Sequence, residues 1–331
     1  SQIKYEIFKN TIPEPTSESI LNAVDILKSG KFDSIIAFGG GSPIDSAKAI
    51  SALASYGGNM SDYKFPYIFN KQAIPIIAIP TTAGTGSEVT KFTIITNEKT
   101  DEKMLCVGTG FLPAAAIVDY ELSLTVPART TADTGIDALT HAIEAYVSKK
   151  ANFFSDTQAI AAMKLIFPNL RLVFKNGNDK KAREKVMIGS TLAGMAFSNA
   201  SVALVHGMSR PIGANYHVPH GLSNAMLLPT VTEFSIPAAP EKYSKCAKAI
   251  GIANFGFFIP QEVGLHKLDY DEGLIVTLFH DASNMSRLAS TGAIEILEIN
   301  RQDSVHTVKG RIDARGSDNN NYLNGSFEVV I

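Results

Sequence analysis

The feature that most restricts the fold is a short apolar run ending in three consecutive glycines, within Phe38-Gly39-Gly40-Gly41-Ser42-Pro43. The run 34–38 is apolar on both faces, as in a strand buried in a parallel sheet, and residues 43–53 have helical spacing. Glycines let a backbone approach a ligand closely, and Pro43 suits a first helical turn. The free N–H groups of this turn predict an anion site suited to a pyrophosphate. The pattern matches neither standard dinucleotide motif nor a P-loop, so a tight turn without a ligand stays an alternative.

A second polar loop, residues 80–90 (PTTAGTGSEVT), follows another apolar run at 74–79. It places hydroxyls and small residues at the carboxyl end of a predicted strand, where open α/β sheets bind ligands. An ordinary loop rich in serine and threonine explains this segment equally well by itself. Two such loops after successive strands favour a nucleotide-binding crevice.

The chain changes character twice along its length. Up to about Val126 strand and helix patterns alternate, including a helix over 17–29 for which Gly30 is the expected stop. Helical patterns then dominate, over 131–148, 153–175, 180–197 and 199–215. Short β-type runs follow at 273–279, 292–299, 306–314 and 325–331. We therefore predict an α/β domain with a parallel sheet over residues 1–128, an all-helical domain over 129–255, and a β-rich tail over 256–331.

Composition narrows the possible partners. The 331 residues are 45% hydrophobic and 19% charged, an ordinary globular profile, and a net charge of −2 leaves no electrostatic footprint for nucleic acid or an anionic membrane. No run approaches the roughly 20 apolar residues that span a bilayer, and the first residues lack a signal-peptide layout. The two cysteines, Cys106 and Cys246, are far apart, as in proteins of a reducing compartment. We expect a cytoplasmic protein with a small-molecule partner.

A helical segment around residue 140 carries the first candidate metal ligands. Asp137 and His141 are four residues apart, so both side chains leave the helix on one face about one turn from each other. That spacing suits two ligands of one ion. An isolated pair of this kind is more often a hydrogen bond or a solvated pair.

Histidines elsewhere make the pair more informative. Four of the seven histidines lie between 141 and 220. His206 follows an apolar helical stretch whose helix we expect to break near Pro211 or to continue to about Ala214, and His220 lies in a predicted tight turn. With Asp137 they form a set of one carboxylate and three imidazoles that suits Fe²⁺ or Zn²⁺. Core or capping histidines without a metal remain the alternative for the set.

These motifs resemble those of the iron-containing (group III) alcohol dehydrogenases. The resemblance covers about residues 1–250 and is carried by FGGGSPIDSAKAI at 38–50, PTTAGTGSEVT at 80–90, the LP…AIVD run ending at Asp119, TADTGIDALTHAIEAYVS at 131–148 and ALVHGMSRPIGANYHVPHGLSNAMLLP at 203–229. It implies a dinucleotide-binding domain followed by a helical metal-binding domain. The implied metal ligands are Asp137, His141, His206 and His220. The implied cofactor contacts are Gly40, Gly41, Ser42, Asp45, Thr81, Thr82, Thr90 and Lys103. A solvated lysine in a charged turn is the plain alternative for Lys103.

The resemblance also implies a reaction. A divalent ion, Fe²⁺ by similarity and Zn²⁺ or another ion by chemistry, polarises the oxygen of a small alcohol or aldehyde. Hydride passes between the adjacent carbon and NAD or NADP, and the protein supplies orientation and a dry cleft. A homodimer fits the same resemblance.

Three features depart from the family pattern. Many members have a proton-relaying histidine four residues after the third metal ligand, where this chain has Arg210, which cannot act as a base near neutral pH. His217 is the remaining candidate for the relay, beside water or a cofactor hydroxyl.

The chain begins at what resembles the family's second strand, at residues 3–8, so the residue that selects NAD or NADP is not visible. The tail beyond about Ile252 has no counterpart, which leads us to expect metal binding to be better preserved than turnover.

Two other functions fit parts of this pattern. A lyase of the dehydroquinate-synthase type also combines NAD with a metal, but it returns the hydride within one turnover, so net cofactor consumption separates the two. A metal-binding protein without catalysis is the second alternative. Metal binding without NAD(H) binding would favour it.

Overall fold

The computed structural model describes residues 3–216 and 218–251, and in the tail the strands 264–267, 277–278, 287–302, 305–316 and 322–330. The chain divides into two compact units, residues 1–251 and 252–331. The first unit contains all the candidate site residues, of which His217 lies outside the described residues.

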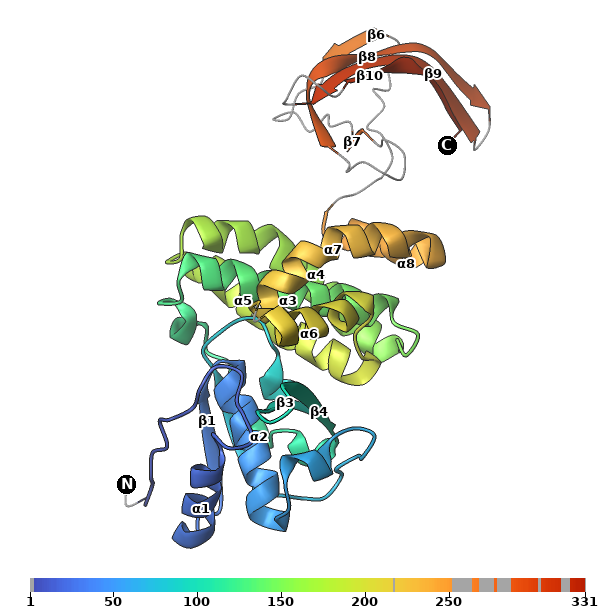
Figure 1. The fold of residues 1–331 in the computed structure, drawn as a ribbon. Coiled ribbons are helices and arrows are strands. Elements are labelled where there is room, and N and C mark those ends of the chain that lie inside the picture. Colours follow the sequence, from blue (N-terminus) through green and yellow to red (C-terminus); the bar gives the residue numbers. More distant parts are fainter. Residues whose placement is uncertain are drawn as a thin grey trace. The chain divides into compact units, whose positions relative to one another are not determined.

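The first part of the chain forms a parallel sheet with helices, as predicted. Strands β1 (Ile35–Gly39), β2 (Ile76–Pro80) and β5 (Ala115–Ala116) pair in the order β1-β2-β5, all parallel. Helix α1 (Leu21–Gly30) packs on α2 (Gly41–Tyr56), which packs on β1 and β2 (Figure 1). Short 3₁₀ turns complete the unit: η1 (Met60–Tyr63), η2 (Ser87–Val89), η3 (Thr109–Phe111), η4 (Tyr120–Ser123) and η5 (Ile236–Ala238).

Some local features of this part differ from the sequence expectations. Residues 3–8 form no strand, because Ile3, Tyr5 and Ile7 are 72–77% exposed and have no neighbouring strand to pack on. Helix α1 ends at Gly30, the expected stop, and Lys31 follows as its left-handed C-cap with a φ of 53°, but the helix begins at Leu21 rather than at residue 17. An antiparallel hairpin of β3 (Phe92–Asn97) and β4 (Glu102–Val107) was not predicted at all. This hairpin brings Lys103 against the site described below.

Residues 128–249 are helical, with six helices among the described residues (Figure 1). They are α3 (Ala128–Val147), α4 (Phe153–Lys175), α5 (Lys180–Ala200), α6 (Leu204–Tyr216), α7 (His220–Ser235) and α8 (Pro240–Ala249). Small side chains such as Ala142, Ala162 and Ala193 are fully buried where α3, α4 and α5 pack together. Small residues at such contacts let the helix axes approach closely, which keeps α3 rigid.

The helix boundaries near the histidines differ from expectation. Helix α6 passes through Pro211, although a proline inside a helix removes one i→i−4 hydrogen bond, and it ends at Tyr216 rather than near Ala214. His220 is the first residue of α7, with Pro219 as its N-cap, rather than part of a separate tight turn. Both histidines therefore sit on helices, which hold them more rigidly than loops would.

All described residues of the tail are strands, as the sequence predicted for this part (Figure 1). β8 (Arg287–Gln302), β9 (Val305–Gly316) and β10 (Tyr322–Val330) form an antiparallel meander, with β6 (Gly264–Lys267) and β7 (Thr277–Leu278) paired to β8. Three of the four predicted runs fall in β8, β9 and β10. Most of the fourth, 273–279, lies outside the described residues, apart from β7.

Within the described part of the chain, no single helix is long and apolar enough to cross a bilayer, and one pair, α5 with residues 204–213 of α6, passes that test only jointly, with a bend of 101°.

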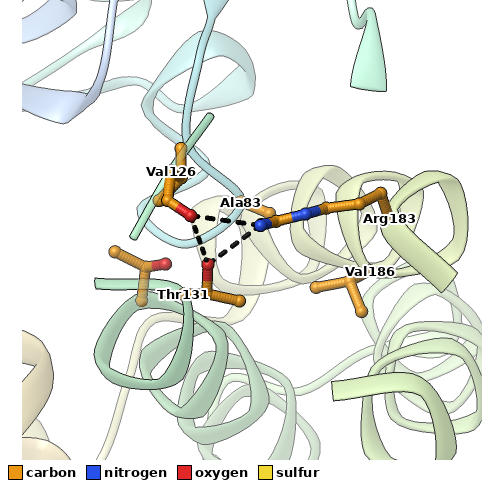
Figure 2. A pocket seen from close by; sticks show the side chains of 6 residues that line it. Ala83, Val126, Thr131, Arg183 and Val186 are labelled. Carbon is orange, nitrogen blue, oxygen red and sulfur yellow. Dashed lines mark hydrogen bonds between the residues drawn. The ribbon is translucent and has the colours of Figure 1, made fainter. Parts of the chain in front are cut away.

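Arg183 ties the sheet-bearing part of the first unit to its helices (Figure 2). This side chain of α5 is 4% exposed, and its guanidinium donates to the carbonyl of Val126 at 3.1 Å, the hydroxyl of Thr131 at 2.9 Å and the carbonyl of Gly177 at 2.9 Å. Val126 and Thr131 border the start of α3. The guanidinium therefore fixes the entry of the helix that carries Asp137 and His141.

We expect Arg183→Leu to lower the free energy of unfolding by about 2–4 kcal/mol, because two carbonyls and a hydroxyl lose their donors in a buried place. Urea unfolding followed by far-UV circular dichroism measures it. Arg171→Leu, at an exposed position of α4, is the matched control and changes stability by less than about 0.5 kcal/mol. Equal effects of the two substitutions would contradict the role of Arg183.

Candidate metal centre and cofactor cleft

Four side chains from three helices converge in the first unit. Asp137 and His141 come from α3, His206 from α6 and His220 from α7, and one potential ligand atom of each lies within 4.8 Å of all the others. From the Oδ1 atom of Asp137, the Nε2 atom of His206 is 3.4 Å away, that of His220 3.6 Å and that of His141 3.9 Å. Asp137 and His141 are neighbours because of their helical spacing. All four side chains meet only because α6 and α7 pack beside α3.

These distances suit a bound divalent ion. A tetrahedral ion with bonds of about 2.1 Å separates its ligand atoms by about 3.4 Å, so the cluster needs only small inward movements. Asn224 of α7 gives independent support. Its Nδ2 atom lies 2.7 Å from Oδ1 of Asp137 and 3.1 and 3.2 Å from Nε2 of His206 and His220. Two amide hydrogens cannot satisfy three acceptors, so the acceptors are arranged for a cation.

The charges within the cluster favour metal binding. Burial by itself raises the pKa of Asp137, but the imidazoles of His141, His220 and His206 outweigh it and hold that pKa well below its usual range. Burial lowers the pKa of His141 to about 3, against the pull of Asp137, and burial also lowers the pKa of His220. At neutral pH the carboxylate is therefore ionised and these two imidazoles offer free lone pairs.

Glu144 orients the third imidazole. Its side chain is buried on α3, and its Oε2 atom lies 2.6 Å from Nδ1 of His206. Its Oε1 atom accepts from the backbone N–H of Val205 at 2.5 Å, at the start of α6. Burial lowers the pKa of His206, but hydrogen bonds with Asp137 and Glu144 raise it overall. Holding Nδ1 in this way directs Nε2 into the cluster, the arrangement of a carboxylate–histidine–metal site.

Aromatic stacking holds His141 from the other side. Its ring stacks on Phe197 at 4.2 Å between centroids and on His206 at 4.4 Å, and Phe197 stacks on Phe92 of β3 at 5.9 Å. Sequence reasoning did not single out Glu144, Asn224, Phe197 or Phe92 as part of the site. Only Glu144 left a signal, since it lies on the same helical face as Asp137 and His141.

A cavity of about 300 Å³ joins the cluster to the glycine turn. At one end it is lined by Asp137, His141, His206 and His220, and at the other by Gly41 and Ser42. Of the other predicted cofactor contacts, Asp45, Thr90 and Lys103 also line it. Gly40, Thr81 and Thr82 are not among its lining residues. A cavity of this size is within the range of ligand sites.

The glycines are needed at this turn. A Cβ at Gly41 would lie 2.7 Å from the Cγ2 atom of Thr85, and one at Gly40 would lie 3.2 Å from the hydroxyl of Thr82. The turn and the second polar loop are therefore in direct contact, with the amide of Thr81 donating to the carbonyl of Gly39 at 2.9 Å. No side chain caps the start of α2, so its first N–H groups face the cavity end without a protein side-chain acceptor there.

Asp45, Thr90 and Lys103 have protein partners as well. The carboxylate of Asp45 accepts from the hydroxyl of Ser87 at 2.5 Å and the amide of Ile94 at 3.0 Å. The hydroxyl of Thr90 accepts from the ammonium of Lys48 at 3.1 Å, and Lys103 pairs with Glu14 at 2.6 Å. Burial lowers the pKa of Lys48 to about 8. These contacts fix the cavity wall and leave Asp45 fewer free lone pairs than the sequence suggested.

Comparisons with known proteins find the same family that the sequence motifs resemble. Residues 1–120 match the model of iron-containing alcohol dehydrogenases, and residues 131–259 match that of the C-terminal part of the Fe-containing alcohol dehydrogenase family. The chain is 38% identical over 299 residues to alcohol dehydrogenase 4 of Saccharomyces cerevisiae, which covers 85% of this chain and 78% of that protein. It is 40% identical over 245 residues to the NAD-dependent methanol dehydrogenase of Bacillus methanolicus, covering 74% and 64%.

Among solved structures, a 1,3-propanediol oxidoreductase superposes with a TM-score of 0.72 at 40% identity. That match covers 74% of this chain and 64% of the other, so the chain spans less than two thirds of this relative.

We expect Glu144→Gln to weaken the affinity for Zn²⁺ about 10- to 100-fold, because the amide has one acceptor oxygen for two donors and must place its NH₂ group opposite the Nδ1–H of His206 or the N–H of Val205. Competition with a chromophoric chelator on the metal-free protein measures the affinity. Glu184→Gln, at an exposed position of α5, is the matched control and leaves it unchanged. An unchanged affinity in Glu144→Gln, with an unchanged melting temperature, would exclude the orienting role.

Proposed function

The chain belongs to the iron-containing alcohol dehydrogenase family, and from this we propose that it transfers a hydride between a small alcohol or aldehyde and a nicotinamide cofactor. The observation that carries this function is the cavity with a four-ligand metal cluster at one end and the glycine turn at the other. A substrate oxygen at the cluster and a dinucleotide on the turn would meet in this one cavity. That arrangement serves hydride transfer, which needs orientation and exclusion of water.

In this proposal Asp137, His141, His206 and His220 hold the metal ion. The family indicates Fe²⁺, and the donor set also accepts Zn²⁺ or another divalent ion. When bound, the ion withdraws electrons from the substrate oxygen and so favours the charge that develops there. Glu144 keeps the imidazole of His206 in its metal-binding orientation, and Phe197 packs on His141.

The cofactor lies on the glycine turn and the second polar loop. Its pyrophosphate binds the free N–H groups at the start of α2, and the ribose and nicotinamide follow the cavity toward the cluster. The residues assigned to it are Gly40, Gly41, Ser42, Asp45, Thr81, Thr82, Thr90 and Lys103. The relatives include an NAD-dependent methanol dehydrogenase and an NADPH-dependent butanol dehydrogenase, so NAD and NADP are both tested.

The remaining assignments belong to the same proposal. Residues 1–128 act as the dinucleotide-binding domain, 129–255 as the metal-binding domain, and 256–331 as a separate tail. His217 relays the proton, since Arg210 cannot. The protein works in the cytoplasm as a homodimer, with no nucleic acid or membrane as partner.

We expect the purified chain to retain a stoichiometric divalent ion and to reduce short aldehydes with NADH more slowly than the roughly 1–1,000 per second usual for enzymes, because we expect metal binding to be better preserved than turnover. Elemental analysis measures the first and loss of NADH absorbance the second. Asp137→Ala and His206→Ala lose both, because each removes a ligand from the cluster. Exposed Arg171→Leu is the control that loses neither.

Two outcomes would overturn the proposed function. Metal retention without NAD(H) binding identifies a metal-binding protein that does not catalyse. NAD(H) binding without net cofactor consumption, with turnover of a cyclising phosphate ester, identifies a lyase of the dehydroquinate-synthase type.

A further inference from the structure

Arg210 is a cation in the cavity with no protein partner among the described residues. It lines the cavity together with His206 and His220, and its side chain is partly buried. Its guanidinium makes no hydrogen bond and no ion pair with any residue that the structure describes. Burial lowers its pKa, but a guanidinium remains charged at any physiological pH. Glu144 acts on this charge only at a distance, and a partly buried charge without an ion pair or hydrogen bond is costly, so the guanidinium is placed to meet an anion.

The acids near Arg210 are already engaged. Glu144 attracts it, but the oxygens of Glu144 accept from the amide of Val205 and face the ring of His206. Asp137 faces the imidazoles and the amide of Asn224. Glu14, whose amide donates to the hydroxyl of Ser42 at 3.3 Å, pairs with Lys103. None of these carboxylates is free to neutralise the guanidinium.

The position of Arg210 sets the distance to the reaction centre. It follows His206 by four residues on α6, so the two side chains leave the helix on one face about 5–6 Å apart at their Cβ atoms. Arg210 and Lys103 both act electrostatically on His220, which places positive charge at the metal end of the cavity. The glycine turn lies at the other end, so a cofactor pyrophosphate does not explain this cation.

We propose that Arg210 binds an anionic group of the substrate, so that the alcohol or aldehyde carries a carboxylate, sulfonate or phosphonate a few carbons from the reacting oxygen. This rests on the proposed function. A guanidinium binds such groups through two parallel N–H donors, which fixes their orientation as well as their charge. In the reducing direction, the carbonyl carbon gains a hydride from NAD(P)H and its oxygen gains a proton. The products are the hydroxy acid and NAD(P)⁺.

The test compares 4-oxobutanoate with butanal, two four-carbon aldehydes that differ in the group at the far end. We expect the wild-type protein to show a kcat/KM at least about tenfold higher for the oxo acid, and Arg210→Met to lower the ratio of the two values about 10- to 100-fold, through KM. Arg210→Lys keeps part of the preference, because it retains the charge without the fork. Exposed Arg171→Met leaves the ratio unchanged. Sulfoacetaldehyde and phosphonoacetaldehyde, compared in the same way with propanal, show which anion is preferred.

Other outcomes overturn the proposal separately from the proposed function. A wild-type preference for butanal that Arg210→Met does not alter excludes anion recognition while leaving the dehydrogenase activity intact. A rise in the KM for NADH or NADPH, without a change in the aldehyde ratio, assigns Arg210 to the cofactor instead. Failure to reduce any aldehyde contradicts the proposed function. In that case the anion site is tested by calorimetry with 4-hydroxybutanoate and butan-1-ol. If 4-hydroxybutanoate does not bind, or if it binds the wild-type protein and Arg210→Met equally well, the anion site is overturned.

Discussion

The buried carboxylate of Glu144 is the contact on which the candidate site depends. It joins α3 to the start of α6 and fixes the ring of His206 at the same time. Without it, the Nδ1–H of His206 and the first amides of α6 would be buried without an acceptor. Asp137 and His141 already share the face of α3 from which Glu144 projects. One rigid helix face therefore carries two ligands and positions a third, and α7 adds His220.

Buried contacts of α2 also fix the cavity wall near the glycine turn. Asp45 ties α2 to the second polar loop through Ser87 and to β3 through the amide of Ile94. Lys48, buried on the same helix, donates to both the carbonyl and the hydroxyl of Thr90. Buried charges are tolerated here because each has acceptors or donors of its own. These contacts make the cofactor end of the cavity a preformed surface, and they relate it to the hairpin that carries Lys103.

Helix positions and buried parallel strands could be predicted because their signals are local. The helix over 153–175 was predicted with the bounds that α4 has, and the strand before the glycine turn differs from β1 by a single residue at each end. The hairpin β3–β4 could not, since its strands lack strict alternation and their pairing depends on neighbours. The expected strand at residues 3–8 has an apolar pattern but no partner strand, so its side chains stay exposed.

For the site, the sequence by itself determined which residue types are available and how those on one helix are spaced. Asp137, His141 and Glu144 share a face of α3 by helical geometry alone, and the glycine turn must begin a helix. Tertiary structure decided which distant side chains meet them: the convergence of His206 and His220, the amide of Asn224 in the middle of the cluster, and the unpaired guanidinium of Arg210 in the cavity. The reason is physical. Periodicity follows from backbone geometry within a few residues, whereas convergence depends on how whole helices pack.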